Sequence, residues 1–168
     1  MKKLMIIIAF FTLNISNSQD KVSLEVFQDA KLMFIGDGER YEKGTINIIG
    51  RLKMEGLQSK YGFLTVFPEY EYAEIQGIYK RYSAGIGYNF NRLIINNWSV
   101  EAFITYGWID RDNASSFSYS FGLGSYYKLN KSFSIALLGQ MTERKDLKVL
   151  WNDNALRFSG FFGLKIGL

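Results

Sequence analysis

The sequence predicts an all-β fold, an eight-stranded antiparallel barrel in which consecutive strands run up and down. Three observations support this prediction. Apolar and polar residues alternate with a period of two along most of the chain, which is typical of strands with two different faces. Aromatic residues make up 17% of the sequence and glycines number 16, whereas Pro68 is the single proline. The scarcity of proline suits long strands, because proline removes a hydrogen-bond donor from the strand ladder. Finally, polar connections separate the alternating segments.

Residues 1–18 are interpreted as a cleaved secretory signal peptide that precedes the barrel. Lys2 and Lys3 form a short basic region, an apolar run follows over 4–13, and small polar residues complete the segment. This order matches a leader, with cleavage expected near Ser18. The apolar run is too short for a membrane-spanning helix, which needs ~20 residues. Residues 19–168 then form a single domain, because they contain no linker and no long internal repeat.

The fifth predicted strand, 98–108, shows the clearest alternation. Trp98 and Trp108 stand at the ends of its apolar face and Ala102 lies between them, opposite residues such as Glu101 and Thr105. The same pattern recurs in three other segments, and weaker versions in four more. In chain order, the predicted strands cover 22–34, 46–54, 62–72, 82–90, 98–108, 117–129, 133–141 and 157–168.

The connections between these strands are of two alternating kinds. Polar and charged connections lie at 36–44, 73–78, 110–116 and 143–155, and mostly shorter ones centre on 57–59, 91–97 and 130–132. Long loops on one side and short turns on the other are typical of an up-and-down barrel whose termini share the turn side.

The two faces of the strands favour a transmembrane barrel over a soluble one. The apolar faces are bulky and carry aromatic residues near their ends, whereas the opposite faces are rich in Gly and Ser. Small residues suit the cramped interior of an eight-stranded barrel, and aliphatic belts flanked by aromatic girdles suit lipid. We assign Tyr88, Trp98, Tyr106 and Trp108 to such a girdle. The alternative, a secreted soluble ligand-binding β-barrel, requires the apolar face to point inward.

Segments such as SAGIGYNF at 83–90 and FSGFFGLKIGL at 158–168 carry the resemblance to a known group. The mature chain, from about Lys21 to Leu168, resembles the small eight-stranded outer-membrane barrels of the OmpA/OmpX type. It departs from the best-known members by ending in Leu168 rather than an aromatic residue. The resemblance implies the outer membrane of a Gram-negative-type bacterium. It implies no activity, because members of this group have diverse functions.

The sequence contains neither Cys nor His. This absence excludes disulfides, thiolate chemistry, His metal sites and Ser/His or Cys/His catalysis. The formal charge of +4 includes Lys2 and Lys3 of the leader, so the mature chain is close to neutral, which argues against a nucleic-acid binder. We therefore expect no catalytic residue, no metal and no cofactor. The expected partners are outer-membrane lipid and other envelope proteins.

Charged residues on the predicted inward faces are expected to form an ion-pair network, because buried charges are costly unless paired. The predicted register pairs Asp29 with Arg51, Glu71 with Arg81, Glu101 with Lys128 and Glu25 with Lys165. Three further inward charges are predicted at Lys31, Lys53 and Glu69.

The outer loops offer candidate contact residues, namely Tyr41 and the apolar triplet Val149, Leu150 and Trp151. Exposed apolar residues on a charged loop are typical of interaction sites. The predicted function is therefore that of a non-enzymatic outer-membrane barrel with a structural, adhesive or envelope-complex role. A narrow or gated pore, opened by breaking the interior ion pairs, is the alternative.

Overall fold

A computed structural model of the chain describes residues 22–36, 42–75, 77–91, 97–111, 114–152 and 155–168. The predicted signal peptide and its cleavage site near Ser18 lie outside these residues. Among the described residues, no helix is long and apolar enough to cross a bilayer. The elements are β1 (Val22–Asp29), α2 (Ala30–Phe34), β2 (Asn47–Gln58), β3 (Gly62–Glu74), β4 (Ile78–Phe90), β5 (Trp98–Arg111), β6 (Ala114–Lys128), β7 (Phe133–Glu143), α3 (Lys145–Trp151) and β8 (Leu156–Gly167).

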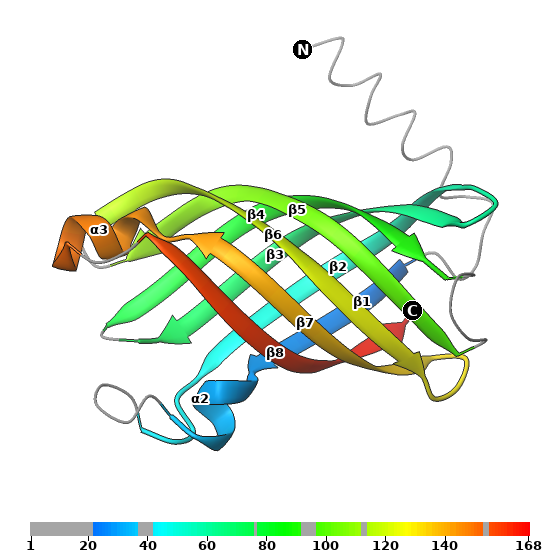
Figure 1. Ribbon diagram of the computed structural model, residues 1–168, viewed down its shortest axis with the longest axis horizontal. Coiled ribbons are helices and arrows are strands. Elements are labelled where there is room, and N and C mark those ends of the chain that lie inside the picture. The colour runs from blue at the N-terminus through cyan, green and yellow to red at the C-terminus, as the bar shows by residue number, and fades with distance from the viewer. Residues whose placement is uncertain (1–21, 37–41, 76, 92–96, 112–113, 153–154) are drawn as a thin grey trace, which may run out of the picture.

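The strands form one closed barrel in sequence order, which confirms the predicted fold class. Every neighbouring pair is antiparallel, and β1 closes the barrel by pairing with β8 from Ser23 opposite Gly167 to Asp29 opposite Phe161. Closure leaves no strand edge unpaired. Figure 1 shows the tilted strands, with α2 and α3 at one end and the C-terminus at the other. We call these the loop end and the turn end.

Alternating burial follows the predicted two faces. In β5 the side chains of Glu101, Phe103 and Thr105 are buried inside the barrel, whereas Ala102 and Ile104 are exposed on its outer surface. This is the inward and outward alternation that a pleated strand imposes on a closed sheet. The apolar face therefore points outward.

The first predicted strand was wrong in its second half, because the chain turns into α2 after Asp29. The Asp29 carboxylate accepts a hydrogen bond from the Leu32 amide at 2.9 Å, which is a helix N-cap. Gly36 ends this turn with a φ of 78°, and its amide donates to the Lys31 carbonyl at 2.9 Å. A left-handed glycine after the last turn is a common helix end. Lys31, predicted to point inward, is consequently exposed.

The loop-end connections also differ from prediction. The strands on both sides of two loops are longer than predicted. Around 73–78, β3 ends at Glu74 and β4 begins at Ile78. Around 110–116, β5 ends at Arg111 and β6 begins at Ala114. The long connection 143–155 contains the helix α3 rather than a continuous loop. These extensions place predicted loop residues, above all Arg111, on barrel walls.

Candidate functional site: the barrel interior

Charged side chains fill much of the barrel interior. Glu25, Lys53, Arg81 and Glu101 are each 0% exposed, and Arg51 is 1% exposed. An ion taken out of water destabilises the fold unless opposite charges and hydrogen bonds surround it. The partners of these side chains therefore determine what the interior can do.

Glu69 on β3 holds the central ion-pair cluster together. Its Oε2 lies 2.6 Å from Nε and Nη2 of Arg51 on β2. Its Oε1 lies 2.6 Å from Nη1 of Arg81 on β4 and also accepts a hydrogen bond from Ser83 at 2.9 Å. One carboxylate thus bridges two guanidinium groups. These guanidinium groups also donate hydrogen bonds to oxygen atoms of the side chains of Thr105, Ser118, Ser120 and Gln140.

A second cluster centres on Lys53, nearer the turn end. The Lys53 Nζ lies 2.6 Å from Glu25 Oε1 and 2.5 Å from Glu101 Oε2. It also lies 2.7 Å from the hydroxyl of Tyr126, which in turn donates to Glu101 at 2.8 Å. Thr65 donates to the other oxygen of Glu101 at 2.5 Å. These groups come from four strands, β1, β2, β5 and β6, together with Thr65 of β3, so they tie opposite walls of the barrel together.

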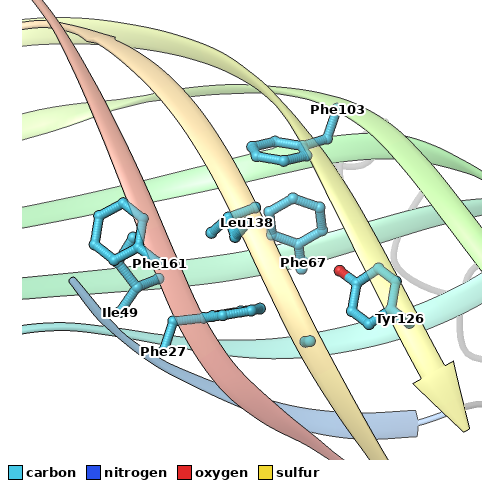
Figure 2. Close-up of a cluster of buried hydrophobic side chains, with 8 residues drawn as sticks. Phe27, Ile49, Phe67, Phe103, Tyr126, Leu138 and Phe161 are labelled. Atoms are coloured by element: carbon cyan, nitrogen blue, oxygen red, sulfur yellow. The ribbon is translucent and has the colours of Figure 1, made fainter. Parts of the chain in front are cut away.

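Aromatic rings pack between the charged clusters. Figure 2 shows the buried set, which comprises Phe27, Ile49, Phe67, Phe103, Tyr126, Ala136, Leu138 and Phe161. The Arg51 guanidinium lies 4.3 Å from the Phe103 ring centroid and 4.8 Å from that of Phe67, within cation–π range. A methyl group built on Gly122 would overlap the Phe103 ring, so glycines on the walls make room for the rings.

The sequence did not predict this aromatic core, because we assigned bulky residues to the outer face. Phe103 occupies an inward position of the clearest predicted strand, and Tyr126 is an inward neighbour of the predicted outward Tyr127. Their positions in the period-two pattern were the available signal. The interior is consequently packed by rings as well as ion pairs.

A third cluster lies at the loop end, where α3 meets the barrel. The Asp146 carboxylate accepts hydrogen bonds from Arg144 at 2.9 and 2.8 Å and from Arg111 at 3.1 Å. Arg144 stacks over the Tyr79 ring, 3.8 Å from its centroid. Asp146 is fully buried. These contacts anchor α3 to the walls β4 and β5.

The surroundings of Asp146 set the pKa of its carboxyl. Burial alone would raise this pKa, but the hydrogen bond from Arg144 and the charges of Arg144 and Arg111 outweigh burial. The pKa of Asp146 therefore lies below its ordinary value of 3.8, because opposite charges and donors favour the ionised form. Asp146 remains charged at neutral pH.

The predicted ion pairs are rearranged in the structure. Arg51 pairs with Glu69 rather than Asp29, and Glu101 pairs with Lys53 rather than Lys128. Lys128 is exposed at the end of β6, because Glu101 lies opposite Gly124 in the observed register. The predicted pairing of Lys128 with Glu101 was therefore wrong, and Lys128 lies exposed at the turn end of the barrel.

Two predicted pairs are neighbours across a strand pair without forming the expected ion pair. Glu71 lies opposite Arg81, and Glu25 lies opposite Lys165. Arg81 nevertheless reaches Glu69, and Lys165 lies 3.4 Å from Glu55. Glu71 instead accepts a hydrogen bond from the Tyr79 hydroxyl at 3.2 Å.

The predicted girdle residues lie on the outer surface. Trp98, Tyr106 and Trp108 are exposed and Tyr88 is half-buried. Trp98 and Trp108 stand near opposite ends of β5. Trp98 packs on Tyr127, and Trp108 packs edge-on against Phe117 with the ring centroids 4.6 Å apart. Aromatic pairs thus occur near both ends of the outer wall.

Of the predicted contact residues, the structure describes the side chains of Val149 and Leu150. Val149 on α3 is 73% exposed, whereas Leu150 is half-buried. Tyr41 and the side chain of Trp151 lie outside the described part of the structure. Beside α3, the loop end also exposes apolar side chains that the sequence did not single out, Met33 and Phe34 of α2 and the following Ile35.

Comparisons with known proteins bear on the fold. The outer-membrane protein Ail of Yersinia pestis, determined in a phospholipid bilayer nanodisc, matches with a TM-score of 0.55 and 15% sequence identity. The match covers 89% of this chain and 100% of Ail. This chain has the fold of a small outer-membrane β-barrel.

Other comparisons add little to this likeness. A de novo designed transmembrane β-barrel matches over 88% of this chain and 93% of the design, with a TM-score of 0.45 and 15% identity. No protein-family model matches the chain, and no curated protein matches it in sequence. Within the described residues, no group of three or more acidic side chains is placed to hold a metal ion.

Proposed function

We propose that this protein is a non-enzymatic barrel of the outer membrane, closed to ions, with a structural, adhesive or complex-forming role at its loop end. One observation carries the proposal: the barrel is apolar outside and ionic inside. Every strand contributes exposed apolar side chains to the outer wall. They include Leu24, Val26, Ile48, Leu52, Tyr70, Ile86, Ile104, Phe121, Leu123, Leu137, Phe162 and Leu164.

A lipid environment accounts for this arrangement. A water-exposed surface of this kind would be one large apolar patch, which monomeric soluble proteins rarely expose. In a bilayer, lipid-facing residues are apolar and lumen-facing residues are polar. The same orientation argues against a soluble ligand-binding barrel, whose apolar face lines the lumen.

The filled lumen supports a closed barrel rather than a pore. Three buried clusters, centred on Lys53, Glu69 and Asp146, occupy successive levels between the turn end and the loop end. Passage of solutes would require these ion pairs to separate, which is unfavourable because it leaves buried charges without partners.

Electrophoretic migration and bilayer currents test the barrel and its closure together. The protein extracted in detergent should migrate differently on a denaturing gel before and after boiling, as a stable membrane barrel does. Inserted in a planar bilayer, the folded form should produce no stepwise current. Identical migration before and after boiling would contradict the membrane barrel. Regular single-channel steps from the unboiled form would contradict closure.

The contact role is tested at Val149, the most exposed of the predicted loop-end residues. A photoreactive amino acid at position 149 in intact cells should form discrete cross-linked products. The same amino acid at Gln58, exposed at the turn end of β2, serves as the control. An absence of products at 149, or the same products at both positions, would contradict a loop-end contact role.

A further inference from the structure

A cavity of about 1020 Å³ lies at the turn end of the barrel. Its walls come from most of the strands, including β1, β4, β5, β6 and β8. Phe63 and Tyr126 are among its deepest lining residues, since both are almost fully buried. Its volume lies at the upper end of the range of small-molecule sites, ~300–1,000 Å³.

Basic side chains outnumber acidic ones around this cavity. Lys128 on β6, Lys131 in the following turn and Lys165 on β8 line it, together with the single carboxylate side chain of Glu55 among the described lining residues. Lys165 lies 3.4 Å from Glu55, a long contact between two partly exposed groups. This pairing leaves Lys128 and Lys131 as positive charges at the mouth, so the cavity favours an anion.

Among the described residues, two buried polar side chains of the wall each have one atom without a hydrogen-bond partner. The Ser23 hydroxyl and the Asn89 Oδ1 accept and donate no hydrogen bond among the described residues, although Ser23 is 3% and Asn89 is 1% exposed. The Asn89 amide nitrogen makes only a 3.5 Å contact to Ser99. A buried polar group without a partner is destabilising, and the two orientations of an Asn amide are interchangeable. Both side chains thus offer hydrogen bonds to a ligand in the cavity.

The inner end of the cavity is closed by the Lys53 cluster. Tyr126, which lines the cavity, binds Lys53 and Glu101 through its hydroxyl, and these groups join opposite walls. The cavity is therefore a pocket with one mouth, suited to holding a ligand rather than conducting it.

We propose that the turn-end cavity binds a small ligand through an oxyanion, a carboxylate or phosphate group. Lys128 and Lys131 supply the positive charge, and Ser23 and Asn89 supply hydrogen bonds from the wall. Ammonium groups bind oxyanions through charge-assisted hydrogen bonds, which are stronger than neutral ones. This inference concerns the turn end and is independent of the proposed loop-end contact role.

An NMR titration of the full chain in detergent micelles tests this proposal. Inorganic phosphate and acetate are added in separate arms, with chloride at matched ionic strength as the reference. We expect saturable shifts of the amide signals of Ser23, Asn89 and Ser99. Stronger binding of phosphate than of acetate would identify a phosphate site, and the reverse a carboxylate site. Linear shifts equal to those in chloride would overturn the proposal.

Variants distinguish specific binding of the anion in the cavity from non-specific attraction of anions to a basic surface. Lys128→Gln is exposed and should preserve the fold while weakening binding about tenfold, the loss expected for one charge-assisted hydrogen bond. The matched control is Lys148→Gln, which removes an exposed lysine from α3 at the opposite end. Ser23→Ala should weaken binding without changing net charge. Equal effects of Lys128→Gln and Lys148→Gln, or no effect of Ser23→Ala, would contradict a built site.

Discussion

At the scale of single residues, Glu69 is the side chain on which the interior depends most. Its two carboxylate oxygens form ion pairs with Arg51 and Arg81, both buried, at 2.6 Å. Among the described residues, Arg51 and Arg81 each form their ion pair with Glu69. Loss of its charge therefore leaves two buried guanidinium groups without their ion-pair partner.

Glu69→Gln should lower the free energy of unfolding by about 3–5 kcal/mol, the cost of removing one partner of a buried pair. The amide keeps the size and some hydrogen bonds of Glu69, so the loss reports mainly on charge. Reversible unfolding in lipid vesicles measures the difference. Glu42→Gln, at an exposed position between α2 and β2, should change stability by less than about 0.5 kcal/mol. Similar losses in both variants would contradict the role of Glu69.

The sequence predicted which residues are charged and inward more successfully than it predicted their partners. The register of two paired strands determines which residues lie opposite one another, and the predicted register correctly placed Glu71 opposite Arg81. Long side chains also reach across the lumen, as Lys53 of β2 does to Glu101 of β5. Such contacts between non-adjacent strands depend on the curvature and closure of the barrel, which no local sequence pattern encodes.

At the scale of elements, the strands were predictable and the two helices were not. Alternation over 98–108 and 82–90 persists for enough residues to establish a period of two. α2 is only five residues long, too short to show a helical period, and the Asp29 cap that starts it also continues the strand pattern. In α3, Leu147, Leu150 and Trp151 have the i, i+3, i+4 spacing of a helix, a signal hidden by surrounding charges.

The attachment of α3 should depend on pH through Asp146. Its pKa in the folded protein lies below the ordinary value of 3.8 because Arg144 and Arg111 favour the carboxylate. A lowered folded pKa contributes stability above the unfolded value, and this contribution disappears as pH falls through the folded pKa. We therefore expect α3 to stay docked from pH 7 to about pH 5 and to loosen below about pH 4.

NMR signals of the α3 amides in micelles measure this loosening. In Asp146→Asn they should already resemble the loosened state at pH 7 and change little on acidification. Signals of the central strands serve as the internal reference. If α3 of Asp146→Asn loosens over the same acidic range as the unmodified chain, another group controls the helix.

At the scale of the whole molecule, the barrel is apolar on its outer surface and ionic inside, as expected for a protein surrounded by lipid. Outward apolar side chains lie on all eight strands, and aromatic residues stand near both ends of β5. Inside, ion pairs and rings fill the lumen between walls that contain many glycines. A closed sheet satisfies the backbone hydrogen bonds of its strands, which is a condition for spanning lipid.

A charge on the outer wall tests this view directly. Ala102 is exposed on β5 between Trp98 and Trp108, where the bilayer centre is expected. Ala102→Arg should lower the stability in lipid vesicles by about 2–4 kcal/mol, whereas Leu57→Arg, at a 79% exposed position near the turn end of β2, should cost at most about 1 kcal/mol, because the cost of a lipid-facing charge falls toward the interface. In a soluble barrel both positions face water and both changes would be small. Equal, small losses in vesicles would therefore contradict a membrane-spanning wall, and a loss confined to Ala102→Arg would place the centre of the bilayer at this level of β5.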